Sequence, residues 1–133
     1  MLVTVIVVTY NCECFIEDAL NSVYWQTYAD LELIVTDDCS TDNSVSVTRQ
    51  WIEKHTERFV RVCQTQTQKN AGVTANYNNG LKEATGEWIK CLDSDDMLPG
   101  TAIEIYVKHC KTSPFFPVWY SNEQLFDNSG IKD

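Results

Sequence analysis

Positive charge is scarce in this sequence. Only 10 lysine and arginine residues stand against 19 aspartate and glutamate residues, and the formal net charge is −9. Nucleic acid and anionic membranes both require a basic face on their protein partner, so we expect neither as a direct partner. A nucleotide is not excluded by the same argument, because a divalent cation held by carboxylates can bridge to its phosphates.

Long hydrophobic runs and paired cysteine motifs are also missing. The apolar stretch Leu2–Val8 is far shorter than the roughly 20 residues of a membrane-spanning helix, and no basic segment precedes it. The six cysteines include no C-x-x-C pair, and neither histidine has zinc-finger spacing. Cys63 and Cys91 fall in apolar runs, where cysteine acts as a small hydrophobe. We therefore expect free buried thiols in a cytoplasmic protein, with no membrane contact encoded in the chain.

Apolar periodicity alternates between strand-like and helix-like segments along residues 1–133, a length that suits a single domain. The expected strands are Leu2–Thr9, Leu31–Thr36, Phe59–Cys63 and Trp88–Leu92, with short closing strands at Val118–Tyr120 and Gln124–Phe126. The expected helices begin near Ile16, after a cap at Asp42 or Ser40, after Gly72, and at Pro99. This alternation predicts an α/β fold with a Rossmann-like, mostly parallel sheet and helices on both faces.

Polar clusters follow three of these strands. They are Thr9-Tyr10-Asn11, Asp37-Asp38 and Asp93-Ser94-Asp95-Asp96. In open parallel sheets, ligands bind outside the carboxyl ends of the strands, where these clusters fall. The sequence therefore predicts one binding site built from segments that are far apart in the chain.

The acidic cluster carries the most specific chemistry. Asp93 and Asp95 lie two positions apart after a buried strand, so a turn there can direct both carboxylates at one cation. Mg²⁺ and Mn²⁺ favour such oxygen ligands and keep positions open for water and phosphates. The alternative is a solvated, helix-capping turn before Pro99. A calcium loop does not fit, since Leu98 occupies the position that requires glycine.

The other clusters offer groups that suit a nucleotide. Tyr10 has an aromatic face on which a base can stack, and Asp38 can accept hydrogen bonds from a ribose hydroxyl or a base imide. Gly72 lets the backbone approach a ligand closely, and Lys69 beside it can face a phosphate. Each of these has a plainer alternative: a structural turn, a helix cap or a solvated lysine. The candidate binding residues are Thr9, Tyr10, Asn11, Asp38, Lys69, Asn70, Gly72, Asp93 and Ser94, with Asp93 and Asp95 as metal ligands.

Four ordered segments resemble the family 2 glycosyltransferases, which have the GT-A fold. They are VIVVTYN, LIVTDDCSTDNS, NAGVTANYNNGL and GEWIKCLDSDD, and the similarity extends from Leu2 to about Gly130. The resemblance implies inverting transfer of a hexosyl group from a nucleotide-diphosphate donor, with a UDP-sugar expected, to a saccharide or lipid-linked acceptor. It also implies that Tyr10 lies against the base and Asp38 contacts base or ribose. The motif Asp93-Ser94-Asp95 matches the family's D-x-D, with Asp95 binding Mn²⁺ or Mg²⁺ directly and Asp93 approaching ribose and metal.

The sequence departs from the family pattern in three places. Cys39 stands where glycine is common, and Asn76-Tyr77-Asn78 replaces a common Ala-Arg-Asn. The chain also ends at Asp133, before the segment that in longer members holds the general base and binds the acceptor. Glu123 and Asp127 come too early by motif order to be that base, so we assign no catalytic residue.

These features leave alternatives open. The chain can be the donor-binding part of an enzyme of polysaccharide biosynthesis, which in full length can lie peripherally at the inner membrane. It can instead be a non-catalytic module that binds nucleotide sugars. A receiver-type domain is a weaker alternative, because such domains place an acidic pair after the first strand, which here ends in Thr9-Tyr10-Asn11. A dinucleotide oxidoreductase lacks its G-x-G-x-x-G motif.

Overall fold

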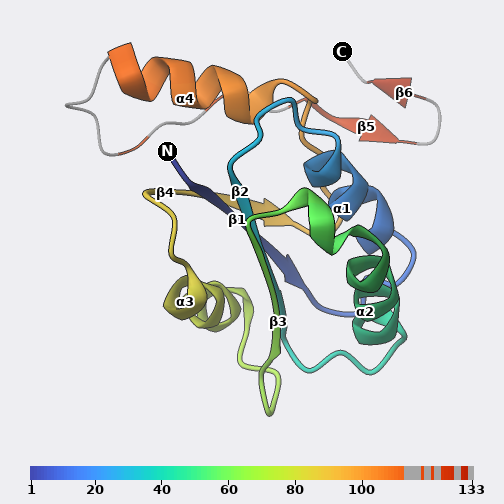
Figure 1. Cartoon of the computed structure of the whole chain (residues 1–133). Coiled ribbons are helices and arrows are strands. Elements are labelled where there is room, and N and C mark those ends of the chain that lie inside the picture. The colour runs from blue at the N-terminus through green and yellow to red at the C-terminus, as the bar shows by residue number, and fades with distance from the viewer. Residues whose placement is uncertain (113–117, 119–120, 122–123, 128–129, 132–133) are drawn as a thin grey trace.

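The computed structural model describes residues 1–112, 118, 121, 124–127 and 130–131 (Figure 1). Four strands form one sheet: β1 (Val3–Thr9), β2 (Leu31–Asp37), β3 (Arg61–Gln66) and β4 (Trp88–Asp93). The α-helices are α1 (Ile16–Tyr24), α2 (Ser44–His55), α3 (Val73–Glu83) and α4 (Ala102–Thr112), and a 3₁₀ turn covers Thr56–Arg58. Two short strands, β5 (Phe126–Asp127) and β6 (Gly130–Ile131), pair antiparallel outside the main sheet. The predicted α/β fold is confirmed.

All four strands of the main sheet are parallel, in the order β3-β2-β1-β4. Every residue of β1 and β2 is buried, as expected for apolar strands covered on both faces. The order matches one half of a Rossmann sheet and differs from the 2-1-3-4-5 order of receiver domains, so the receiver alternative is wrong. It also places the reversal of strand order between β1 and β4, where ligands bind in open α/β sheets.

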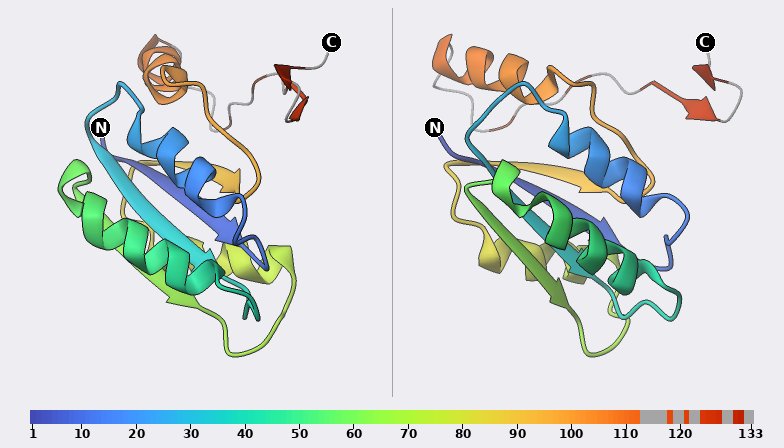
Figure 2. Two further views of the ribbon diagram at one scale, coloured as in Figure 1. Left: turned by 90° about the vertical axis from the view of Figure 1, so that its right-hand side faces the viewer. Right: turned by 45° about the vertical axis from the view of Figure 1, so that its right-hand side comes forward.

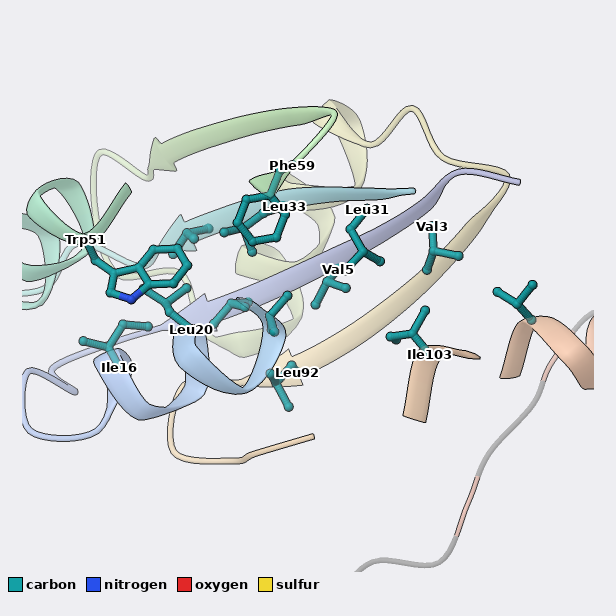
Figure 3. Close-up of a cluster of buried hydrophobic side chains, with 14 residues drawn as sticks. Val3, Val5, Ile16, Leu20, Leu31, Leu33, Trp51, Phe59, Leu92 and Ile103 are labelled. Carbon is teal, nitrogen blue, oxygen red and sulfur yellow. The ribbon is translucent and has the colours of Figure 1, made fainter. Parts of the chain in front are cut away.

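Helices cover both faces of the sheet. Figure 2 shows α1 and α2 on one side and α3 on the other. The larger core lies on the side of α1 and α2 (Figure 3) and includes Val5, Ile16, Leu20, Leu33, Trp51 and Ile103. On the other side, α3 packs against Ile6, Val8 and Ile34. The approach of α3 is close because Gly80 has no side chain: a Cβ there would lie 2.6 Å from Ile6 Cγ2.

The third strand differs from the expected Phe59–Cys63. Phe59 is buried in the core, and strand pairing begins two residues later, where Arg61 lies opposite Glu32. The strand then continues through polar residues to Gln66. Because β3 is an edge strand with partly exposed side chains, its sequence lacks the apolar run that marks β1 and β2.

The thiol prediction was correct about pairing and wrong about burial. All six cysteines are free, but only Cys110 is buried. Cys63 is half-buried on the edge strand β3, and Cys91 is exposed. Cys91 is on β4, which forms the other edge of the sheet, and it pairs with Ile6 of β1. Helix α3 packs mainly over β1 and β2 and therefore leaves Cys91 exposed.

Helix α4 begins at Ala102, so Pro99 lies in the preceding turn rather than in the helix. Gln26 holds this turn: its side-chain amide donates to Pro99 O (2.8 Å) and its Oε1 accepts from Ile103 N (3.1 Å). Helix α2 begins at Ser44 with Asn43 at its N-cap position, so neither Asp42 nor Ser40 is the cap; Asp42 lies one position earlier and accepts from Ser44 N (2.9 Å).

The chain's last predicted strands are only partly testable. The strand at Phe126–Asp127 overlaps the expected Gln124–Phe126 at one residue. Of Val118–Tyr120, residues 119 and 120 lie outside the described residues, and Val118 is not in a strand. Within the described ranges, no helix has both the length and the apolar character needed to cross a membrane.

Candidate functional site

The three predicted polar clusters lie together at the carboxyl end of the sheet. Main-chain hydrogen bonds join them at the carboxyl end of β1, which lies between β2 and β4. Asp38 N donates to Thr9 O (2.9 Å), and Ser94 N donates to Val8 O (3.1 Å). The loops after β1, β2 and β4 therefore leave the sheet side by side, and the candidate residues are close in space although distant in sequence.

The acidic segment after β4 forms a tight turn. Asp96 N donates to Asp93 O (3.1 Å), which reverses the chain across Ser94 and Asp95. The side chains of Asp93 and Asp95 are exposed, and the ion pairs found among the described residues involve neither of them. Two carboxylates are therefore presented at the rim of the sheet, and no lysine or arginine of the described part of the chain forms an ion pair with them.

Ser94, between these two aspartates, differs from them in its surroundings. It is buried, and its side chain is hydrogen-bonded to Cys12 in the loop after β1. Burial raises the pKa of the Cys12 thiol, the hydrogen bond from Ser94 acts in the opposite direction, and the charges of Asp95 and Asp42 raise the pKa further. The raised pKa keeps the Cys12 thiol protonated at neutral pH, and its contact with Ser94 links the loops after β1 and β4.

Asp38 is buried, with 2% of its surface exposed, and its carboxylate has three protein donors. Thr67 Oγ1 (3.0 Å), Ala71 N (2.9 Å) and Gly72 N (2.8 Å) all donate to it. Burial alone would raise the pKa of Asp38, but these hydrogen bonds outweigh it and the pKa is lowered. Asp38 thus fixes the loop from residue 67 to residue 72 at the end of β2.

This loop also carries Lys69 and Asn70, which are both exposed. Thr67 Oγ1 also lies 2.9 Å from Lys69 O, so its single proton is shared between this carbonyl and Asp38. Gly72 adopts φ 87°, a backbone conformation that favours glycine, and the first turn of α3 follows directly. The loop is therefore held in one shape by protein contacts, and the Lys69 side chain extends from it.

The three residues after β1 have different surroundings. Thr9 is buried, and its hydroxyl has no hydrogen-bond partner within the described part of the chain. Tyr10 is 49% exposed at the rim. Asn11 has φ 49° and turns its side chain to the loop after β2, where its Oδ1 accepts from Thr41 N (2.8 Å). Of the three side chains, only that of Tyr10 is both exposed and available for a planar ligand.

Sequence reasoning missed two residues of α3 that organise the site. Asn76 is buried and joins the ends of β1 and β2: its amide donates to Thr36 O (3.0 Å) and Thr9 O (3.2 Å). Tyr77 donates its hydroxyl to Asp93 Oδ1 (2.7 Å). The only signal in the sequence was their departure from the Ala-Arg-Asn pattern, which does not indicate contacts across the sheet.

The carboxylate oxygens of the acidic turn suit a hard divalent cation that also binds phosphate oxygens. Within the described residues, no group of three or more histidine, cysteine, aspartate or glutamate side chains is arranged to hold a metal. Mg²⁺ in phosphate-binding sites typically uses one or two carboxylates and completes its shell with water and phosphate oxygens. Asp93 and Asp95 match that requirement.

A separate cavity of about 200 Å³ lies away from this rim, between β4 and α4. Its lining includes Val3, Trp88 and Val107, near the amino-terminal ends of β1 and β4. The cavity has no acidic group in its lining, and it is at the opposite end of the strands from the acidic turn. It does not belong to the candidate site.

Two solved structures resemble this chain in fold and sequence. S. aureus TarS (residues 1–349), in complex with UDP-GlcNAc, is 32% identical with a TM-score of 0.75, covering 86% of this chain and 32% of TarS. The mannosyltransferase PcManGT from Pyrobaculum calidifontis, in complex with GDP-Man and Mn²⁺, is 36% identical with a TM-score of 0.68, covering 73% of this chain and 28% of PcManGT.

Sequence comparison gives the same family. An uncharacterized glycosyltransferase from Haemophilus influenzae is 37% identical over 103 residues, which are 77% of this chain and 40% of that protein. The chain spans less than half the length of the curated relatives that it matches. The family model for glycosyl transferase family 2 matches residues 4–128. With this match over nearly its whole length, and with the sheet order and rim described above, the chain belongs to glycosyl transferase family 2.

Proposed function

We propose that this chain binds a nucleotide-diphosphate sugar, with a UDP-sugar as the preferred donor, and that the protein transfers the sugar to a saccharide or lipid-linked acceptor with inversion. The observation that carries the proposal is the meeting of the Tyr10 loop and the Asp93–Asp96 turn at the point where the strand order reverses. The relatives support the donor class, since one solved structure holds UDP-GlcNAc and another GDP-Man with Mn²⁺.

Each exposed rim residue has a distinct part in this proposal. The ring of Tyr10 provides a stacking face for the base, and Asp93 and Asp95 provide carboxylate ligands for Mn²⁺ or Mg²⁺. Lys69 extends from the loop that Asp38 holds in place and can reach a phosphate. The bound cation would offset the negative charge that develops on the leaving diphosphate.

Asp38 and the main chain of residues 70–72 form the other wall of the proposed donor site. The three protein donors leave the Asp38 carboxylate able to accept one further hydrogen bond, because a carboxylate has about four acceptor positions. A base imide or ribose hydroxyl is the proposed donor of that bond. Ser94 and Asn11 contribute by shaping the loops, since their side chains contact Cys12 and Thr41.

We assign no general base within this chain. Glu123 lies outside the described residues, and so does the Asp127 side chain. The proposal places the protein in the cytoplasm, which its six unpaired cysteines support because a reducing compartment keeps thiols free.

Titration calorimetry with UDP, GDP and their sugars, in Mn²⁺, Mg²⁺ or EDTA, tests donor binding. We expect UDP to bind only with a divalent cation and the Asp95→Ala variant to lose that binding. Glu53→Gln, which removes an exposed carboxylate on α2, is the matched control and should bind normally. Equal binding in EDTA, or an unaffected Asp95→Ala variant, would contradict the metal assignment.

Turnover is tested separately from binding. Incubating the protein with UDP-sugar and saccharide or lipid-linked acceptors, with NMR of the anomeric proton of the product, reports both transfer and its stereochemistry. Metal-dependent binding without transfer to any acceptor would favour the alternative of a non-catalytic nucleotide-sugar-binding module.

A further inference from the structure

Helix α3 is held firmly against the carboxyl ends of the strands. Asn76 anchors its first turn to Thr9 O and Thr36 O, and Gly80 lets its second turn approach Ile6 closely. Tyr77 follows Asn76 directly, and its side chain packs against the apolar cluster formed by Ile6, Val8 and Ile34. Its position is therefore determined by packing on the sheet.

From this position the Tyr77 hydroxyl reaches β4 and donates to Asp93 Oδ1 (2.7 Å). Asp93 is on β4, where it pairs with Val8 of β1, and its side chain is otherwise exposed. A tyrosine hydroxyl is neutral at physiological pH, so it donates this hydrogen bond without carrying a charge. One oxygen of an exposed carboxylate is thus held, and Oδ2 remains for a ligand.

The group that donates the hydrogen bond to Asp93 is a neutral phenol, and its lack of charge affects how well Asp93 can bind a cation. A lysine or arginine at this position would form an ion pair with Asp93 and would compete electrostatically with a bound metal. A phenol orients the carboxylate and leaves its full negative charge in place. Partners of metal ligands that fix orientation in this way commonly change metal affinity by about 10- to 100-fold when they are removed.

We propose that Tyr77 is a positioning residue for Asp93, holding Oδ1 so that Oδ2 faces the divalent cation of the donor complex. This inference rests on the proposed function, because it assumes that Asp93 contacts the metal. It concerns a residue of α3 that touches neither cation nor donor.

Electron paramagnetic resonance of Mn²⁺, titrated with the protein in the presence of UDP, tests the inference without a turnover assay. We expect Tyr77→Phe to weaken Mn²⁺ binding by about 10-fold, the low end of the range for such partners. Tyr77→Phe keeps the ring that packs on Ile6, and its melting temperature checks that the fold is retained. Asn78→Ala, an exposed neighbour on α3, is the matched control.

A double-mutant cycle separates positioning from an indirect structural effect. If Tyr77 acts through Asp93, Tyr77→Phe will have no further effect on Mn²⁺ affinity in an Asp93→Asn background. Full additivity of the two changes, or wild-type affinity in Tyr77→Phe while Asp95→Ala loses the metal, would overturn the inference and leave the proposed function intact. A wild-type protein that binds no Mn²⁺ with UDP would overturn both.

Discussion

Glu32 and Arg61 form an ion pair across two adjacent strands, with Arg61 Nη1 2.7 Å from Glu32 Oε1. Glu32 has no exposed surface, and its carboxylate also accepts from Thr4 and from the main chain and side chain of Thr85. The pair lies on the face covered by α3, and it joins β1, β2, β3 and the segment before β4. It is a structural centre at the opposite end of the sheet from the acidic turn.

We expect Glu32→Ala to lower the free energy of unfolding by about 3 kcal/mol, because several hydrogen bonds to the buried carboxylate are lost and the buried Thr4 hydroxyl is left without its acceptor. The control is Glu83→Ala, which removes the exposed carboxylate that contacts the same arginine, and it should cost less than about 1 kcal/mol. Urea unfolding measures both. Similar losses in the two variants would contradict a special role for the buried carboxylate.

The same residue predicts how stability depends on pH. Burial acts to raise the pKa of Glu32, but its hydrogen bonds outweigh this and lower the pKa from 4.5 to about 2. Because the folded pKa lies below the unfolded one, the ionised carboxylate stabilises the fold above pH 4.5, and this contribution is lost as the pH falls towards 2. In urea titrations from pH 6 to 2, Glu32→Gln should flatten this decline compared with the wild type.

Cys39 adopts φ 63°, in the left-handed region where a side chain is strained. Cys39→Gly should raise the free energy of unfolding by about 0.5–1 kcal/mol, because relief of a left-handed conformation exceeds the extra entropy of glycine in the unfolded chain. Cys39→Ala keeps the strain and should give no gain. Thermal unfolding of the two variants distinguishes backbone relief from loss of the thiol.

Asp38 should control the local order of the loop from residue 67 to residue 72. In Asp38→Asn, a neutral amide replaces the carboxylate that accepts from Ala71 N and Gly72 N. Hydrogen exchange of these two amides should accelerate at least about 10-fold, since hydrogen bonds to a charged acceptor contribute about 1.5–3 kcal/mol. Exchange in β1 should remain unchanged, and acceleration throughout the sheet would indicate global destabilisation instead.

Close packing of α3 depends on Gly80. Gly80→Ala places a methyl group where Ile6 Cγ2 would be 2.6 Å away, so we expect a loss of about 1–3 kcal/mol from overpacking despite the better helix propensity of alanine. Asn78→Ala, on the exposed face of the same helix, should be neutral or slightly stabilising. Chemical unfolding tests this, and an equal effect in both variants would show that propensity decides.

The sequence predicted most reliably what is encoded locally. The apolar runs of β1 and β2 and the apolar stripe of α1 are continuous patterns in the sequence. Because the strands are parallel, the three polar clusters meet at one end of the sheet. The bounds of β3 were missed because an edge strand needs no apolar run. The exposure of Cys91 was missed because strand composition does not show which strand lies at an edge.

For the candidate site, the sequence predicted the location of the acidic turn and of Tyr10 but not the contacts that hold them in place. Asn76 joins Thr9 and Thr36, and Tyr77 holds Asp93, through contacts between segments that are far apart in the chain. Short-range patterns carry no record of such pairs. For the same reason, the sequence did not show that the carboxylate of Asp38 is enclosed by a loop.

The central place of β1 has a consequence for how the chain acquires its structure. Its first neighbour, β2, is made soon after it, but its second neighbour consists of residues 88–93. During synthesis, β1 therefore has one unpaired edge until residues 88–93 have emerged. The early βαβ segment should consequently be the most prone to self-association, and nascent chains that stop short of Trp88 should depend most on chaperones.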